Sequence, residues 1–307
     1  MAAKDGYLVN EATLLERELF LEREPRVSHS AKVSEAVDHD GNVPMRRGLA
    51  AATMALVFAT AAAILAVLDG KGSEEKVVST YLDVMSAAER VGPPPPLTLA
   101  PYGVLGAQLR TSGSIENKAT VPGSEIAVVD PAGLQFIQDL GPGGAGGASG
   151  AIYQWLGIGQ ASHFPDDVRQ AIRTTGDAKF HKYGPHMAIH VVGPNLAELG
   201  VAGPVSEGIA IDQLAQAYTN VFSEFLLASA RGARVLRLLP ISGGIFAGDF
   251  KEDLPRLTFT ALARGFSRLP ALSQKQLSTS GLRLEMCIFE ESDLSKFRAA
   301  YAVAKQT

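Results

Sequence analysis

Two glycine-rich stretches stand out as places where the backbone itself could bind an anion. In the first, 141–150, six of ten residues are glycine, and residues 151–156 continue it as the first turns of a helix. The N–H groups at the start of a helix have no partner within the helix and lie at the positive end of its dipole, so they can hold phosphate. Glycine-rich segments are more often flexible linkers, and this pattern alone leaves both interpretations open.

The second stretch, 240–248 (PISGGIFAG), follows a buried apolar run directly and precedes a helical pattern. The adjacent Gly243 and Gly244 allow positive φ angles and close backbone approach, so consecutive N–H groups could form an anion-binding nest. The alternative is a tight strand-to-helix turn in which Phe246 fills the core.

The elements that position these loops alternate between strands and helices. Such alternation predicts an α/β sandwich with a largely parallel sheet, in which ligands bind beyond the carboxyl ends of the strands. Both loops, after Asp130 and after Pro240, fall at that edge. We expect strands at 124–130, 187–192, 235–239 and 282–289, and helices at 149–157, 165–173, 208–230, 251–266 and 292–304.

Three motifs in this region together resemble those of a macro domain. They are the loop and helix 146–153 (GGASGAIY), the strand 188–194 (AIHVVGP) and the loop 239–246 (LPISGGIF). They occur in the family's order and at compatible spacing, and the resemblance extends over 102–304. It implies a three-layer α/β/α domain with a mixed, mostly parallel sheet.

The resemblance also implies a ligand, since the family binds ADP-ribose. By matching positions, the first loop would hold the proximal phosphate and ribose side. The second loop would wrap the diphosphate, with Phe246 against the terminal ribose. Phe289 would stack on adenine, although a core role is equally compatible with its position. The positions expected to contact the ligand are Ser114, Ile115, Asp130, Gly146, Gly147, Ala148, Ser149, Gly150, Ser242, Gly243, Gly244, Ile245, Phe246 and Phe289.

Three polar positions depart from the family pattern. The family's Asn-Ala-Ala-Asn corresponds to Asp130-Pro131-Ala132-Gly133, so the amide that orients the terminal ribose is missing, and Asp130 adds a negative charge near the ribose and diphosphate. The loop aspartate of the hydrolases corresponds to Ser149, which cannot act as a carboxylate base. The adenine-binding aspartate corresponds to Ser114, which lacks charge assistance. We therefore assign no catalytic residue.

The N-terminal part of the chain lies outside the resemblance. Residues 1–47 form a polar tail, 48–68 a candidate transmembrane helix and 69–100 a stalk with a proline run, before the macro-like domain at 101–307. The stretch 48–68 has no charged residue and would span about 31 Å as a helix, close to the thickness of a bilayer core. Its nine alanines also fit a helix buried in protein. The sequence leaves the compartment undecided.

Composition excludes several other functions. A net charge of −4 and the lack of a long basic run argue against binding duplex nucleic acid. Cys287 is the only cysteine, which rules out an internal disulfide and a cysteine-based metal cluster. His186 and His190 would lie about 13 Å apart on a strand, too far for one zinc ion. We expect no metal and no cofactor, with ADP-ribose as ligand.

These observations favour a membrane-tethered macro-like module that binds ADP-ribose, an ADP-ribosylated protein or a related nucleotide diphosphate without hydrolysis. One alternative is a non-binding structural or interaction subunit of a membrane assembly, which Asp130, Pro131 and Gly133 would favour. A third is an ADP-ribosyl hydrolase with relocated chemistry, for which the sequence offers no candidate base.

Overall fold

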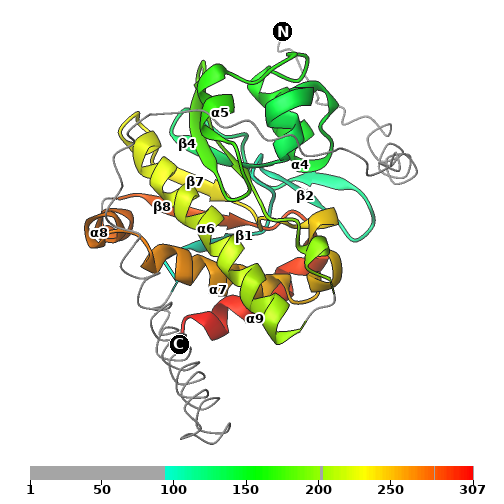
Figure 1. Cartoon of the computed structure of the whole chain (residues 1–307), viewed down its shortest axis with the longest axis vertical. Coiled ribbons are helices and arrows are strands. Elements are labelled where there is room, and N and C mark those ends of the chain that lie inside the picture. Colours follow the sequence, from blue (N-terminus) through cyan, green and yellow to red (C-terminus); the bar gives the residue numbers. More distant parts are fainter. Residues whose placement is uncertain (1–93, 201–202, 280, 307) are drawn as a thin grey trace, which may run out of the picture. The chain divides into compact units, whose positions relative to one another are not determined.

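The computed structural model describes residues 94–200, 203–279 and 281–306 (Figure 1). The polar tail, the candidate membrane helix at 48–68 and most of the stalk lie outside the described residues. Within the described part, no helix is both long and apolar enough to cross a bilayer.

A six-stranded sheet lies at the centre, with the strand order β1-β8-β7-β4-β6-β5. Every neighbouring pair is parallel except β5 and β6, which form an antiparallel hairpin. The prediction of a mixed, mostly parallel sheet is therefore confirmed. The strands are β1 (Thr98–Ala100), β4 (Ile126–Ala132), β5 (Ala178–Tyr183), β6 (His186–Val192), β7 (Val235–Leu238) and β8 (Arg283–Cys287).

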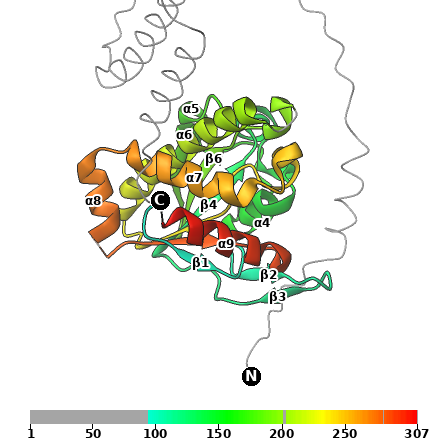
Figure 2. The same ribbon diagram turned by 90° about the horizontal axis from the view of Figure 1, so that it is seen from below.

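Helices cover both faces of this sheet, which gives three layers (Figures 1 and 2). On one face α7 packs between α6 and α9, and α4 and α5 lie on the other. A short helix, α8, follows α7. The bounds are α4 (Gly147–Leu156), α5 (Asp166–Ala171), α6 (Pro204–Ser229), α7 (Leu254–Ser267), α8 (Ala271–Thr279) and α9 (Leu294–Ala304).

The central strand β4 shows how the sheet is buried from both sides. Ala127 and Val129 belong to the core under α6, whereas Val128 belongs to the core under α4, and all three side chains are fully buried. Successive side chains of a strand point to opposite faces, so a strand covered on both faces needs a continuous apolar run. This is why β4 could be found from its sequence.

Pro131 continues β4 beyond the predicted end at Asp130. Strand β7 pairs only with the first half of β4, Ile126 to Val128, whereas β6 pairs along to Ala132. The Pro131 portion therefore has a neighbouring strand on one side only. A proline is tolerated there because no donor is required toward β7.

The strands and helices predicted within 101–307 are all present with slightly shifted ends, but several elements of the described residues were missed. The strands β1, β2 (Ala107–Leu109) and β3 (Ile115–Asn117) have three residues each, too few for a periodic pattern. Strand β5 lies at the edge of the sheet and carries Lys179, His181 and Lys182, so it has no apolar run. Helix α8 is weakly amphipathic and mostly exposed.

Candidate functional site

The two glycine-rich loops lie at the same edge of the sheet. Strands β4, β7 and β8 are parallel neighbours, so the segments that follow them emerge side by side at their carboxyl ends (Figure 1). The first loop follows β4 after one short helical turn, η1 (Phe136–Leu140), and contains a second one, η2 (Pro142–Gly144). The second loop follows β7, and Phe289 follows β8. The edge therefore carries all three groups that the sequence placed at a ligand site.

The first loop presents uncapped amides to solvent at the start of α4. The helix begins at Gly147, two residues before its predicted start, and no side chain caps its first turn. Gly146, Gly147 and Ala148 are exposed. A Cβ at Gly150 would lie 2.4 Å from the carbonyl oxygen of Ala145, so only glycine lets the loop fold this closely onto the helix. The N–H groups of this turn are available to an anion.

Ser149 fixes the start of α4 to the end of β4. Its hydroxyl donates to the carbonyl oxygen of Pro131 at 3.2 Å, and its side chain is half-buried. The residue that stands where the hydrolases have a carboxylate is thus engaged in a hydrogen bond with the backbone.

The backbone of the second loop is constrained by a hydrogen bond to the segment after β6. Ser242 adopts a φ of 62°, and its buried hydroxyl donates to the carbonyl oxygen of Pro194 at 2.6 Å. Gly243 forms the turn by donating its N–H to Pro240 at 3.3 Å. Gly244 then has a φ of 67° and is exposed. With this backbone, Gly244 and Ile245 are exposed to solvent shortly after the end of β7.

Two apolar side chains follow in the same loop. Ile245 is 69% exposed, which is unusual for a large aliphatic residue, whereas Phe246 is half-buried. Phe246 is therefore neither fully buried in the core nor fully exposed. Its position is compatible both with packing in a strand-to-helix turn and with contact to a ribose.

Asp130 lies elsewhere than predicted, because it is fully buried rather than facing the ligand edge. Its Oδ2 lies 2.7 Å from Nδ1 of His190, and Nε2 of His190 lies 2.8 Å from the hydroxyl of Tyr183. Asp130 and His190 are directly opposite each other on β4 and β6, with side chains toward the α4 layer. Its charge is thus directed to a partner inside the domain.

Two tyrosines surround this buried pair. Burial raises the pKa of Tyr153 well above its ordinary value, and the negative charge of Asp130 adds to the effect. Burial also raises the pKa of Tyr183, with further contributions from Asp130 and Asp167. Both phenols therefore stay protonated at neutral pH, and neither can act as a base there.

The residues expected near adenine are brought together by the hairpin β2–β3. Leu109 of β2 pairs with Ile115 and donates its N–H to the carbonyl oxygen of Phe289 at 2.8 Å. Ser114 lies at the exposed turn of the hairpin, with its hydroxyl 2.9 Å from that of Ser112. Ile115 is 41% and Phe289 40% exposed, so both offer apolar surface to solvent.

Sequence reasoning missed Phe136, whose ring lies between the end of β4 at Gly133 and the first loop at Gly144. A Cβ at Gly133 would lie 3.0 Å from this ring, and one at Gly144 would lie 3.4 Å from it. The ring thus fills the space beside the position where the family has its second asparagine. An aromatic residue in the segment between strand and glycines was the only available signal.

The histidines and the cysteine have separate partners. His181 lies 3.0 Å from Asp167, and the ring of His186 lies 4.3 Å from that of Trp155. No group of three or more potential metal ligands occurs among the described residues. Cys287 is 1% exposed, and burial raises the pKa of its thiol.

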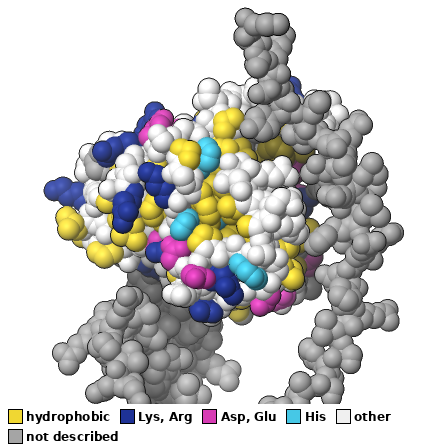
Figure 3. All heavy atoms as spheres, turned by 90° about the horizontal axis from the view of Figure 1, so that it is seen from above, with side chains coloured by type: hydrophobic (Ala, Val, Ile, Leu, Met, Phe, Trp, Pro, Cys, Tyr) yellow, Lys and Arg dark blue, Asp and Glu magenta, His cyan; other side chains and the backbone are white. Residues whose placement is uncertain are grey.

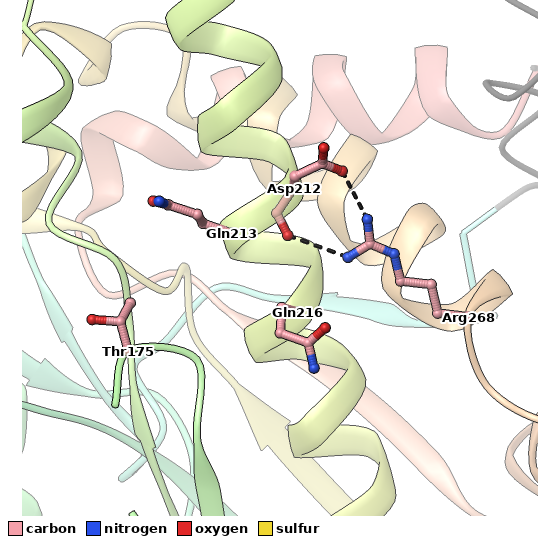
Figure 4. A pocket seen from close by; sticks show the side chains of 5 residues that line it. All are labelled: Thr175, Asp212, Gln213, Gln216 and Arg268. Carbon is pink, nitrogen blue, oxygen red and sulfur yellow. Dashed lines mark hydrogen bonds and ion pairs between the residues drawn. The ribbon is translucent and has the colours of Figure 1, made fainter. Parts of the chain in front are cut away.

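The surface offers two further features. On the face drawn in Figure 3, Lys and Arg side chains stand in separate groups with Asp and Glu between them. A hollow of about 280 Å³ lies over α6 and the end of α7 (Figure 4). Its Arg268 points to Asp212 at 2.7 Å, so these charges are paired with each other. It is lined by Thr175, Asp212, Gln213, Gln216 and Arg268.

No protein-family model and no curated protein matches the chain. Among solved structures, it is similar to the Oceanobacillus iheyensis macrodomain with ADP at 16% identity, covering 59% of this chain and 84% of that one, with a TM-score of 0.39. It is also similar to the poly(ADP-ribose) glycohydrolase from Thermomonospora curvata at 17% identity, covering 69% of this chain and 77% of that one, with a TM-score of 0.37.

A third similar structure, alphavirus P23pro-zbd, shares 21% identity over 59% of this chain, with a TM-score of 0.38. The chain spans only 22% of that structure's length. The similar solved structures thus include macrodomains, the family that the sequence resembles.

Proposed function

We propose that this chain is a macro-like module that binds ADP-ribose or a related nucleotide diphosphate and does not hydrolyse it. The observation that carries the proposal is the pair of exposed, glycine-rich backbone loops after β4 and β7. Strands β4 and β7 are neighbours about 4.8 Å apart, so the segments that lead into the two loops leave the sheet close together. The resemblance of both loops to macro-domain motifs supports ADP-ribose as the diphosphate.

Electrostatics near the first loop favour an anion. The uncapped start of α4 presents the positive end of the helix dipole. Asp139, two residues before the loop, is exposed in η1, whereas the carboxylate of Asp130 at the end of β4 is buried against His190. The negative charge expected to weaken ligand binding is therefore directed away from the loops.

The same residues support binding without hydrolysis. Neither loop, 141–150 nor 240–248, contains an Asp, Glu or His. Ser149 donates its hydroxyl to the backbone, and Gly133 has no side chain to orient a ribose or a water. Because the pKa values of Tyr153 and Tyr183 are raised, these phenols also offer no base.

A second candidate function is a non-binding interaction module that keeps the macro fold. The position of Phe136 favours it, because this ring occupies space between Gly133 and Gly144 beside the first loop. In this case the exposed loops would contact a protein partner, and ADP-ribose would not bind.

Membrane attachment through 48–68 belongs to the proposal as well. Its support is the uncharged stretch of 21 residues, which matches the thickness of a bilayer core. Single-pass membrane localisation predicts that the full chain stays in the membrane pellet after alkaline carbonate washing. Release of the whole chain into the soluble fraction would contradict this part.

The binding claim is tested by calorimetric titration of the full chain with ADP-ribose, ADP and inorganic pyrophosphate, together with a matched pair of valine variants. Gly244 and Gly184 both have positive φ angles, and a Cβ added at either would meet no other atom within 4 Å. Gly244→Val places a side chain in the second loop, whereas Gly184→Val places it in the β5–β6 turn. We expect only Gly244→Val to abolish binding. Equal binding by both variants would refute the site.

Hydrolysis is tested by incubating the chain with an ADP-ribosylated protein and measuring released ADP-ribose. We expect none above the uncatalysed background. Release that disappears in Gly244→Val would instead establish a hydrolase acting at this same site.

A further inference from the structure

Three exposed arginines lie at the edge of the sheet where the strands begin, and we call them the arginine edge. Arg231 follows α6, Arg234 precedes β7, and Arg283 is the first residue of β8. The N–H of Arg283 donates to the carbonyl oxygen of Arg234 at 2.9 Å, so these two are neighbours. Because β4, β7 and β8 are parallel, the arginine edge and the glycine-rich loops lie at opposite ends of the strands.

The charges of the arginine edge have no bonded counter-charge. Within the part of the chain that the structure describes, none of the three forms an ion pair. Arg256 on α7, by contrast, pairs with Glu207 at 2.7 Å. Glu125 precedes β4 at the same edge, but its carboxylate lies against Gly123, where an added Cβ would be 3.0 Å from Oε2. The edge therefore presents three positive charges on a chain whose net charge is −4.

Two large apolar side chains are exposed on the same side of the domain. Leu227 of α6 is 54% exposed, and Arg231 comes about one helical turn after it. Leu272 of α8 is 78% exposed, with the exposed Lys275 three residues later on the same helix face. Helix α8 contacts α6 and leads into β8 (Figures 1 and 2). Basic side chains next to exposed leucines are the combination that binds at a bilayer surface.

The chain enters the described domain from this side. Strand β1 is parallel to β8, and Thr98 at its start lies opposite Glu285, near the start of β8. The uncharged stretch 48–68 is separated from the described structure only by residues 69–93. A bilayer that contained 48–68 would thus be connected to the domain at the end of the sheet that carries the arginine edge.

We propose that the arginine edge binds the anionic headgroups of a lipid bilayer, with Leu227 and Leu272 in contact with the headgroup region. Each Lys or Arg close to an anionic bilayer strengthens binding about fivefold. The orientation rests on the membrane attachment in the proposed function, whereas the charges of the edge act independently of ADP-ribose. Binding in this orientation directs the two glycine-rich loops away from the bilayer, where an ADP-ribosylated protein can reach them.

The first test measures which arginines a bilayer protects. The full chain is reconstituted into vesicles of phosphatidylcholine, with or without phosphatidylserine, and treated with phenylglyoxal. Mass spectrometry then gives the modification at each arginine. Arg173 is the internal control, because it is exposed and its N–H is bonded to Asp177 near the carboxyl end of β6.

We expect phosphatidylserine to slow the modification of all three arginines of the edge several-fold and to leave Arg173 unchanged. The protection should disappear at about 1 M salt, where the screening length is about 3 Å. Equal modification of the edge in both kinds of vesicle, or equal protection of Arg173, would overturn the proposal. This test uses the wild-type chain, so it does not depend on the folding of a variant.

The second test compares a variant with glutamine at all three positions of the edge with a control that loses the same charge elsewhere. The control carries Arg173→Gln, Lys251→Gln and Arg298→Gln, all at exposed positions. Each full chain is synthesised in a cell-free system that contains both kinds of vesicle, and the amounts bound are compared after flotation. We expect the preference for phosphatidylserine to fall at least about tenfold in the edge variant only. An equal fall in the control would contradict a specific surface.

The outcomes separate this inference from the proposed function. A chain that binds ADP-ribose without protection of the arginines by phosphatidylserine retains the ligand site and overturns the role of the arginine edge. Release of the chain by alkaline carbonate removes the membrane span, whereas protection by phosphatidylserine would still support the edge. Binding of duplex DNA that the edge variant loses, without any effect of phosphatidylserine, would overturn the proposal by assigning the surface to nucleic acid.

Discussion

Ser242 provides a test of how the second loop is held in place. Its backbone has a φ of 62°, which costs an L-residue about 1–2 kcal/mol. Its hydroxyl donates at 2.6 Å to Pro194, which is buried at the end of β6. The contact is tight, since a Cβ at Gly193 would lie 2.7 Å from this hydroxyl. We infer that the hydrogen bond to Pro194 maintains the strained backbone of the loop.

The energies of two substitutions follow from this geometry. Ser242→Ala leaves the buried carbonyl of Pro194 without its donor, which costs about 1–3 kcal/mol. Ser242→Gly loses the same bond and relieves the strain, but glycine adds about 0.5–1 kcal/mol of chain entropy to be lost on folding. The glycine variant should therefore be more stable than the alanine variant by roughly 0.7 kcal/mol, taking the middle of both ranges.

Urea unfolding of both variants and of Ser278→Ala measures these differences. Ser278 is exposed, and its hydroxyl bonds only to a carbonyl of its own helix, so the control should stay within about 0.5 kcal/mol of the wild type. Both Ser242 variants should also bind ADP-ribose more weakly, because the loop is no longer held. Wild-type stability of Ser242→Ala, or a glycine variant less stable than the alanine variant, would refute the reasoning.

Three further predictions concern the first loop, the acid limb of stability and the buried thiol. Gly150→Ala should destabilise the chain by about 1–3 kcal/mol in urea unfolding through overpacking and weaken ADP-ribose binding. Gly208→Ala, in open space on α6, should instead stabilise it by about 0.5–1 kcal/mol, and equal effects would contradict the steric argument. Hydrogen bonds from Arg256 lower the pKa of Glu207, so this pair contributes stability above the ordinary carboxyl pKa and loses it as the pH falls through the folded pKa. Glu207→Gln should flatten that acid limb in thermal unfolding scans, and an unchanged limb would exclude the pair as its source. Cys287 should resist iodoacetamide at neutral pH until the chain unfolds, and rapid alkylation of the folded chain would contradict its burial.

The position of the two glycine-rich loops at one edge of the sheet could be predicted because it depends on a regular pattern. Apolar runs such as that of β4 mark strands buried on both faces, and parallel strands direct the following loops to one edge. The glycines at 146–150 and at Gly243 and Gly244 then marked where the backbone is accessible. Such features depend on residues that are close in sequence, so they can be recognised without knowing the tertiary contacts.

The partners of individual polar residues could not be predicted in the same way. Asp130 pairs with His190 only because β4 and β6 align these positions across the sheet. Arg237 reaches Val104 and Thr120 through a hairpin whose strands are too short to be recognised. Such contacts depend on register and on distant segments, neither of which a periodic pattern contains.

The most direct test of the account is calorimetric titration of the full chain with ADP-ribose, repeated with Gly244→Val and with its matched control Gly184→Val. We expect saturable one-to-one binding that is lost only when a side chain blocks the second loop. No heat with millimolar ADP-ribose, or binding that survives in Gly244→Val, would contradict the claim that the two backbone loops form a diphosphate site.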